Sequence, residues 1–460
     1  MRLLETNGQT GRYTALSHCW GKSQMLKTEK STLAQHKQTI SWIALPKTFQ
    51  DAITFVRRIG VRYIWIDSIC IVQDDSADWQ RESAKMASIY ANSFLTVAAT
   101  KSADSKEGCF AVIPNRQRSH KMTRLDGIGM PYTIHSRPTV RHTDNIDGKI
   151  LFPIAYRAWC YQEQVLSPRL LHFNYCELKW ECMEKKSCEC SISDGFSHAK
   201  ISHARALTAG PDIHSINDEW RHMVAEYMQL SLTYESDRLP ALSGLAKQIL
   251  PTRNGRYLAG LWEDSFFEDM MWFLTERDSM RSWRPKVWRA PSWSWASIEG
   301  RITHRIFPIK NIHCTISEVK VTPAGYDPTG AVAWGKLVIL GILVPAILRH
   351  IRPRSDNEEM EEDNRRFGIE IAERALLHKI YVDYQLDEEG TFYIPDRQEV
   401  YCLCIATDQW HKCWLILRRV SYEVTEVYER IGMAWEKPEV IKEHGGWASA
   451  ATANCEVVIV

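Results

Sequence analysis

The chain has 460 residues, enough to bury a large core and more than one ordinary domain holds, so two or three folded units are expected. Lys and Arg number 57 against 56 Asp and Glu, a formal net charge of +1, which does not favour a nucleic-acid partner. The N-terminal residues do not read as a secretory signal, and the most apolar run, residues 337–348, is too short for a membrane span, which needs ~20 residues. We therefore expect a cytoplasmic protein without a membrane span.

Strand and helix signals alternate through the first part of the chain. Apolar runs at Tyr13–Cys19, Arg62–Asp67 and Phe94–Ala98 predict strands, and periodic apolar residues between Leu45 and Gly60 predict a helix. Strands that are linked through helices pair in parallel. Residues 1–175 are therefore predicted to form one α/β domain, with these strands adjacent and parallel.

The rest of the chain divides by its pattern. Residues 101–150 lose periodicity and predict a long excursion from the core. Residues 176–290 predict a helical companion region, with an amphipathic run through Trp262, Phe266, Met270 and Phe273. Residues 291–460 are typical of strands and predict a β-rich C-terminal region, interrupted by a charged, solvated loop at Arg352–Arg366.

The cysteines predict reduced thiols. There are 13 in a chain without a secretion signal, which argues against a disulfide framework. The dense group Cys176, Cys182, Cys188 and Cys190 contains no C-x-x-C pair. From this spacing we expect the group to bind no structural metal.

Three sequence blocks in a fixed order resemble the HET (heterokaryon incompatibility) family of filamentous fungi. They are ALSHCWG at 15–21, the segment from LPKTFQDAI at 45–53 to YIWIDSICIVQDD at 63–75, and RAWCYQEQVLSPRLLHF at 157–173. APSWSWAS at 290–297 resembles the companion region that often follows this domain, so the resemblance covers nearly the whole chain. It implies nonself recognition that ends in programmed cell death, with other proteins of the incompatibility system as partners and with self-association through the HET domain as a further expectation.

A shorter resemblance concerns mechanism. Residues 159–163, WCYQE, resemble the W-C-x-x-E segment of TIR domains, whose glutamate cleaves NAD. With the predicted strand order, this implies a TIR-like, flavodoxin-like parallel-sheet domain with NAD as its substrate and no required cofactor. Glu163 is then the candidate catalytic residue of an NAD glycohydrolase.

One carboxylate can be sufficient for this reaction. Nicotinamide leaves as a neutral amine, and a carboxylate near the ribose stabilises the positive charge that develops in the transition state. Trp159 and Glu163 are i and i+4 on a predicted helix and share a face. The indole would then stand beside the carboxyl and raise its pKa by desolvation.

A candidate binding loop follows the first predicted strand. Parallel α/β sheets bind ligands beyond the carboxyl ends of their strands, and Gly21 would permit close approach to the backbone. Asp67, at the end of the next strand, is expected to face the same crevice at the carboxyl ends of the strands. The candidate binding residues are Ser17, His18, Trp20, Gly21, Asp67 and Trp159.

Structural roles compete with these assignments. Glu163 would be structural if it formed a salt bridge with Arg169 or Lys179, and Asp67 if it capped a helix or paired with Arg157. Both candidate tryptophans are also typical packing residues. The sequence contains no G-x-x-x-x-G-K-[ST] loop, G-x-S-x-G elbow or H-E-x-x-H helix. Two classes remain, an NAD-consuming enzyme and a non-catalytic signalling adaptor that recruits other death effectors.

Overall fold

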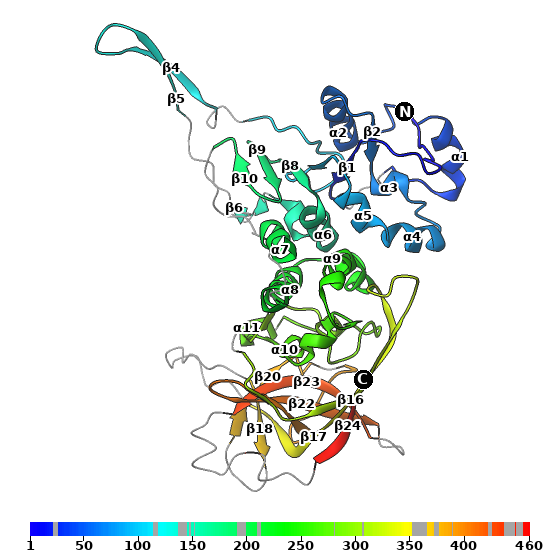
Figure 1. Ribbon diagram of the computed structural model, residues 1–460, viewed down its shortest axis with the longest axis vertical. Helices are drawn as coiled ribbons and strands as arrows, with labels where there is room; N and C mark the ends of the chain where they lie inside the picture. The colour runs from blue at the N-terminus through cyan, green and yellow to red at the C-terminus, as the bar shows by residue number, and fades with distance from the viewer. Residues whose placement is uncertain are drawn as a thin grey trace. The chain divides into compact units, whose positions relative to one another are not determined.

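The chain forms two compact units in the computed structural model (Figure 1). Met1–Gly210 and Leu230–Leu232 make the first unit, and Pro211–Gln229 and Thr233–Val460 make the second. The predicted boundary at residue 175 lies inside the first unit, and the predicted helical region is divided between the two. The structure describes all residues except 22–25, 114–117, 137–144, 147–148, 151, 191–198, 209–212, 280, 306–307, 352–365, 372–376, 389, 422–425, 437–446 and 448–453.

The loop predicted at Arg352–Arg366 therefore lies, except for Arg366, outside the described residues.

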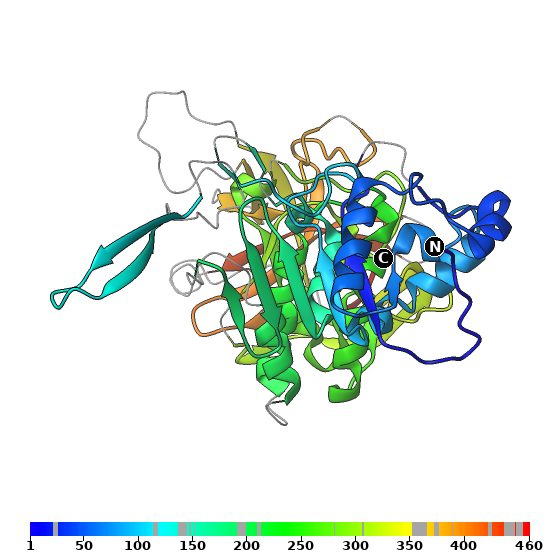
Figure 2. The same cartoon turned by 90° about the horizontal axis from the view of Figure 1, so that it is seen from above.

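The first unit is built on a six-stranded sheet with the order β10-β9-β8-β3-β1-β2 (Figure 2). β1 (Tyr13–Ser17) pairs in parallel with β2 (Tyr63–Trp65) on one side and with β3 (Leu95–Ala98) on the other. The predicted parallel arrangement is confirmed, although each strand is shorter than its apolar run. β3 also pairs in parallel with β8 (Arg169–Phe173).

Two antiparallel strands, neither predicted from the sequence, complete this sheet: β9 (Leu178–Cys182) and β10 (Lys186–Cys188).

Helices cover both faces of the sheet. Successive side chains of a strand point to opposite faces. Val97 belongs to the core that α2 (Lys47–Arg58) covers, whereas its neighbour Ala98 packs with Cys160 of α6 (Ala158–Leu166). α2 follows a proline and ends before a glycine, as the sequence predicted.

The other helices of the first unit lie in the links between strands and after β10. They are α1 (Lys30–Gln38), α3 (Asp67–Cys70), α4 (Ser76–Ser83), α5 (Met86–Ala91) and α7 (Ala199–Thr208), with the 3-10 helix η2 (Pro153–Tyr156).

The described part of the predicted excursion at residues 101–150 contains two pairs of antiparallel strands. A hairpin of β4 (His120–Leu125) and β5 (Pro131–Ser136) has only exposed residues and projects from the first unit (Figure 1). A shorter pair is formed by β6 (Asn145–Ile146) and β7 (Lys149–Ile150).

The chain returns briefly to the first unit at Leu230–Leu232. Ser231 N donates to Tyr156 O at 2.7 Å, and Ala158 N donates to Ser231 O at 3.1 Å. These hydrogen bonds fix the backbone where α6 begins.

The second unit contains a ten-stranded sheet. β17 (Val332–His350) pairs with β24 (Asn454–Ile459) along its middle and with β21 (Glu399–Thr407) toward its end. β22 (Lys412–Ser421) and β23 (Val427–Glu436) link β21 to β24, which closes the circuit of paired strands. The predicted β-rich C-terminal region is confirmed, and its most apolar run is a strand.

The remaining strands of this sheet are β15 (Asn311–Ile312), β16 (Thr315–Pro323), β18 (Phe367–Ile371), β19 (Leu377–Lys379) and β20 (Tyr381–Val382).

The helical prediction for the second unit is only partly right. Its helices are α8 (Ile213–Tyr227), α9 (Ser243–Ile249), α10 (Phe266–Met270) and α11 (Glu276–Ser279), with the 3-10 helices η3 (Glu235–Asp237), η4 (Pro240–Leu242), η5 (Leu250–Thr252), η6 (Glu263–Ser265) and η7 (Trp295–Ser297). None of the described helices is long and apolar enough to span a membrane.

The predicted helix from Trp262 to Phe273 is only partly confirmed, because Phe266 and Met270 lie in α10 whereas the two ends of the run are strands. Trp262 lies in a strand that pairs with its neighbour in sequence, and Phe273 lies in a strand whose partner is about 30 residues away, so pairing overrides the local periodicity. These strands are β11 (Tyr257–Leu258), β12 (Leu261–Trp262), β13 (Trp272–Leu274) and β14 (Ile302–His304).

Candidate functional site

The segment that ends β1 is polar and buried. Ser17, His18 and Cys19 have exposed fractions of 0%, 4% and 3%. Trp20 is half-buried and packs against the core that includes α2. Because β1 is flanked by strands on both sides and by helices on both faces, its carboxyl end lies inside the first unit.

Gly21 allows two loops of the first unit to meet. It has a φ of +72°, and a Cβ at this position would lie 2.2 Å from the Cβ of Asp104. The space beside Gly21 is therefore filled by the loop after β3, which contains Asp104. A side chain here would clash with that loop and strain the backbone.

Asp67 connects the start of α3 to the end of β1. Its Oδ2 accepts a hydrogen bond from Trp20 Nε1 at 2.7 Å, and its Oδ1 accepts one from Ser68 N at 2.7 Å. His18 Nδ1 lies 3.8 Å from Oδ1. Asp67 is the first residue of α3, whose N-cap is Ile66 without a side-chain cap hydrogen bond, so the capping role considered for Asp67 is not confirmed. Among the described ion pairs, none joins Asp67 to Arg157.

α6 carries Glu163 and is held at its C-terminal end. The helix ends before Ser167, because Pro168 disfavours helical backbone in the residue that precedes it. Ser167 Oγ donates to Glu163 O at 2.6 Å and lies 2.7 Å from Thr96 Oγ1 of β3. Buried hydroxyl groups thus fix the last turn of α6 to the sheet.

A lysine of α7 also fixes this end. The Lys200 ammonium donates to the carbonyl oxygens of Gln164 and Ser167, where the helix dipole favours positive charge. Burial lowers the pKa of Lys200 from 10.5 to about 8. The position of Glu163 is therefore determined by contacts on both α7 and β3.

The Glu163 carboxyl is the centre of a cluster of interacting side chains, most of them buried. The other members are Ser17, His18, Cys19, Asp67, Tyr90, Arg157 and Cys160. Glu163 is 4% exposed, and burial raises its pKa from 4.5 to about 7, with the negative charge of Asp67 acting in the same direction. The Ser17 hydroxyl, the charge of Arg157 and the Tyr90 hydroxyl favour the carboxylate and limit this rise. Among the described residues, Glu163 Oε2 makes no hydrogen bond of regular geometry. Glu163 is thus a buried acid whose pKa lies near neutral.

The thiols of this cluster are not thiolates at neutral pH. Burial raises the pKa of Cys19 to about 11 and also raises that of Cys160, whose neighbour Glu163 adds to the effect. Burial lowers the pKa of His18, so the imidazole is neutral. A thiolate nucleophile is therefore not expected here.

The basic residues considered as structural partners of Glu163 interact elsewhere. Arg169 Nη1 donates to Phe94 O at 3.1 Å, and the Lys179 ammonium pairs with Glu181. Among the described ion pairs, none includes Glu163. The salt-bridge alternative therefore loses its proposed partners.

Trp159 lies one turn before Glu163 on α6, as the spacing predicted. Its half-buried ring packs edge-on against Trp79 of α4, with ring centroids 6.4 Å apart. This is a packing contact, and the role of Trp159 in binding stays a prediction.

Tyr90 and Arg157, two members of the cluster, were not candidates from the sequence. Tyr90 is fully buried on α5, and its hydroxyl donates to Leu16 O at 3.1 Å. Arg157 precedes α6 and acts on the charges of Asp67 and Glu163. Arg157 lies in a block that carries the family resemblance, which is the signal that could have identified it.

Comparison with known proteins identifies the same part of the chain. Residues 13–163 match the family model described as "Heterokaryon incompatibility protein (HET)". The match begins at the first residue of β1 and ends at Glu163, so it contains every member of the cluster. No curated protein and no solved structure matched the chain.

Proposed function

Residues 13–163 are a heterokaryon incompatibility (HET) domain, and we propose that this domain hydrolyses NAD with Glu163 as its catalytic carboxylate. The observation that carries the proposal is the buried Glu163 carboxyl, which has a pKa of about 7 and no ion-pair partner among the described residues. Perturbed acids of this kind are concentrated at functional sites.

Hydrolysis of NAD requires one negative charge beside the ribose C1′. The bond between the ribose C1′ and the nicotinamide nitrogen breaks, and its electron pair leaves with neutral nicotinamide. Water then attacks C1′ and loses a proton, which gives ADP-ribose. A carboxylate beside C1′ stabilises the positive charge of the transition state, and it is most effective where water is excluded.

The pKa of Glu163 sets the pH dependence of this role. At pH 7 about half of the carboxyl groups are ionised, and the ionised fraction rises above that pH. Ser17, Tyr90 and Arg157 favour the ionised form. Turnover is therefore expected to increase through pH 7.

Access to the carboxyl requires a conformational change, because Glu163 is 4% exposed. We propose that self-association of the HET domain, or binding of another protein of the incompatibility system, supplies this change. The closed cluster is then the resting state, and NAD consumption begins only after assembly.

The strand order supports the TIR-like part of the proposal. Counted along the chain, β2-β1-β3-β8 corresponds to the beginning of the flavodoxin-like order 2-1-3-4-5. The likeness is limited to these four strands, since β9 and β10 are antiparallel. NAD loss would then be the route to cell death in nonself recognition.

The alternative is an adaptor that recruits other death effectors without chemistry. The surface of the domain would bind the other effectors, and Glu163 would be a buried residue with a structural role only. The two alternatives predict different phenotypes for a Glu163 variant.

The test measures nicotinamide release by the purified full-length chain and NAD content in yeast cells that express it. Under conditions in which the HET domain self-associates, we expect turnover and NAD loss with the wild-type chain, and a decrease on the order of 10²-fold or more with Glu163→Gln. Glu219→Gln is the matched control, because burial and Glu226 raise the pKa of Glu219 to about 7 in the second unit. This control should retain activity.

Growth arrest by both the wild-type chain and Glu163→Gln, with unchanged NAD, would establish the adaptor instead. Absence of NAD loss in both the purified and the cellular assay would also refute the proposal that the HET domain hydrolyses NAD.

A further inference from the structure

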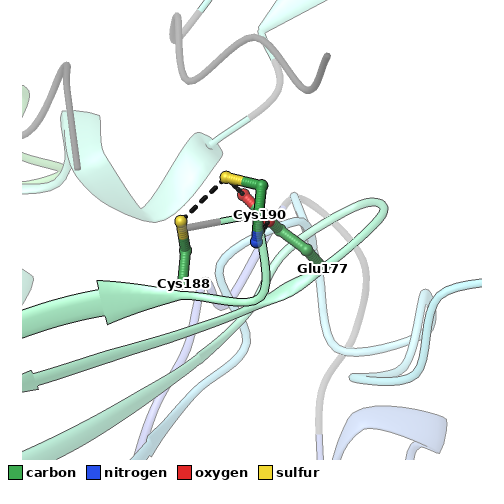
Figure 3. Close-up of side chains that lie close together, drawn as sticks. All are labelled: Glu177, Cys188 and Cys190. Atoms are coloured by element: carbon green, nitrogen blue, oxygen red, sulfur yellow. Dashed lines mark hydrogen bonds between the residues drawn. The ribbon is translucent and has the colours of Figure 1, made fainter. Parts of the chain in front are cut away.

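A second group of reactive side chains lies on the antiparallel side of the first sheet. Glu177 is in the turn between β8 and β9, Cys188 ends β10, and Cys190 follows it after one residue. Figure 3 shows the two thiols and the carboxylate turned toward one another. One ligand atom from each lies within 4.8 Å of the others.

The backbone holds these donors in place. Cys190 N donates to Glu177 Oε2 at 3.1 Å, and Leu178 N donates to Glu189 Oε2 at 2.9 Å. Glu189 N also donates to Leu178 O at 3.3 Å. The segment after β10 is therefore fastened to the start of β9, and the donors come from two strand ends that the sheet brings together.

The separations suit a tetrahedral zinc ion. Zinc lies about 2.3 Å from thiolate sulfur and about 2.0 Å from carboxylate oxygen, so a sulfur and an oxygen on one ion are about 3.5 Å apart. Cys190 Sγ lies 3.7 Å from Glu177 Oε1. The two sulfurs are 2.8 Å apart and would separate by about 1 Å, to the ~3.8 Å of a shared ion, through a small rotation of one side chain.

We propose that Glu177, Cys188 and Cys190 bind a zinc ion, with two thiolates and one carboxylate oxygen as ligands. Both thiols lose their protons on binding, and the fourth position accepts water or another ligand. The carboxylate is 4% exposed, where a divalent cation stabilises its charge. The sequence expectation of no metal depended on cysteine spacing alone, and it did not include this glutamate.

The ion would join the β8–β9 turn to the end of β10. The edge of the first sheet would then be cross-linked by a metal instead of a disulfide. Zinc prefers thiolate ligands over most other protein groups, and the two sulfurs exclude magnesium and calcium as natural occupants.

Cobalt(II) is the probe for this site. We expect the reduced, metal-free full-length chain to bind one equivalent of Co²⁺ with thiolate charge-transfer absorption in the near ultraviolet, and Zn²⁺ to displace it. Cys188→Ser and Cys190→Ser should each remove about half of this absorption and weaken binding ~10-fold or more. Glu177→Gln should weaken binding while the thiolate absorption remains at saturation. Cys182→Ser, a half-buried thiol of β9 outside the cluster, is the control and should bind like the wild type.

A second measurement needs no variant. Zn²⁺ should protect Cys188 and Cys190 of the wild-type chain, and not Cys182, from alkylation read by peptide mass spectrometry. The proposal is overturned if Co²⁺ gives no saturable thiolate absorption, if Cys188→Ser leaves the spectrum unchanged, or if alkylation is insensitive to zinc. A Cys188–Cys190 disulfide that persists under the reducing conditions of the cytosol would equally overturn it.

Discussion

Replacing Glu163 with Gln should make the first unit more stable at neutral and alkaline pH. The folded-state pKa of Glu163 is raised from 4.5 to about 7, chiefly by burial. Below pH 4.5 the carboxyl is protonated in both the folded and the unfolded chain. Between these values the folded chain binds a proton that the unfolded chain has lost. The stability from the protonated group is therefore present below pH 4.5 and is lost as the pH rises through about 7.

The magnitude follows from the shift. The difference between 4.5 and about 7 corresponds to about 3 kcal/mol at 1.36 kcal/mol per pKa unit. Glutamine has a similar shape and no titration, so it removes this pH-dependent loss. The variant should exceed the wild type by up to about 3 kcal/mol at pH 8 and equal it near pH 4.5.

Urea unfolding read by hydrogen exchange on peptides that contain β1 and β3 reports the first unit alone. Both proteins are compared at pH 5 and pH 8, with Glu219→Gln as a control in the second unit. A variant that is less stable than the wild type at pH 8 would restore the salt-bridge role for Glu163. A stability difference independent of pH would refute the assigned pKa.

Three further substitutions test the surroundings of the cluster by urea unfolding of the first unit. Gly21→Ala should cost about 2 kcal/mol or more, because its Cβ meets Asp104 and its φ is positive, and a cost under ~0.5 kcal/mol would contradict this close approach. Trp20→Phe removes the N–H that Asp67 accepts and should cost about 1 to 2 kcal/mol; an unchanged midpoint would show that the bond contributes nothing. Ser167→Ala should cost about 1 kcal/mol, since it removes the hydroxyl that holds the end of α6, and greater stability in this variant would argue against that role.

The parallel part of the first sheet could be predicted because local signals agree with the tertiary structure there. β1 and β3 lie inside the sheet and are almost entirely buried, whereas β2 is an edge strand with Tyr63 exposed. Pro46 and Gly60 mark α2, the second of the two helices described between β1 and β2. The resemblance of residues 159–163 to the W-C-x-x-E segment nominates Glu163, and the helix expected to carry both Trp159 and Glu163 is α6. The pKa of Glu163 required the structure, since burial and the charge of Asp67 come from separate elements.

Features that depend on distant partners were not predictable in this way. The short strand containing Phe273 matches helical spacing locally, but it pairs with Thr303 of β14. A glycine at position 21 predicts that another group approaches the backbone closely, but the sequence does not show that this group is Asp104. Cysteine spacing likewise gives no information about Glu177, because turns and strand pairing bring that carboxylate to the thiols.

The hydrogen bonds of Ser231 fix the start of α6 to a segment that comes much later in the chain. Leu230–Leu232 belongs to the first unit, whereas the chain on either side, through Gln229 and from Thr233, belongs to the second. Ser231 exchanges two backbone hydrogen bonds with Tyr156 and Ala158, on either side of Arg157. A fragment that ends at Glu163 would therefore lack both bonds at the N-terminal end of α6, and it would also lack Lys200 at the other end of the helix.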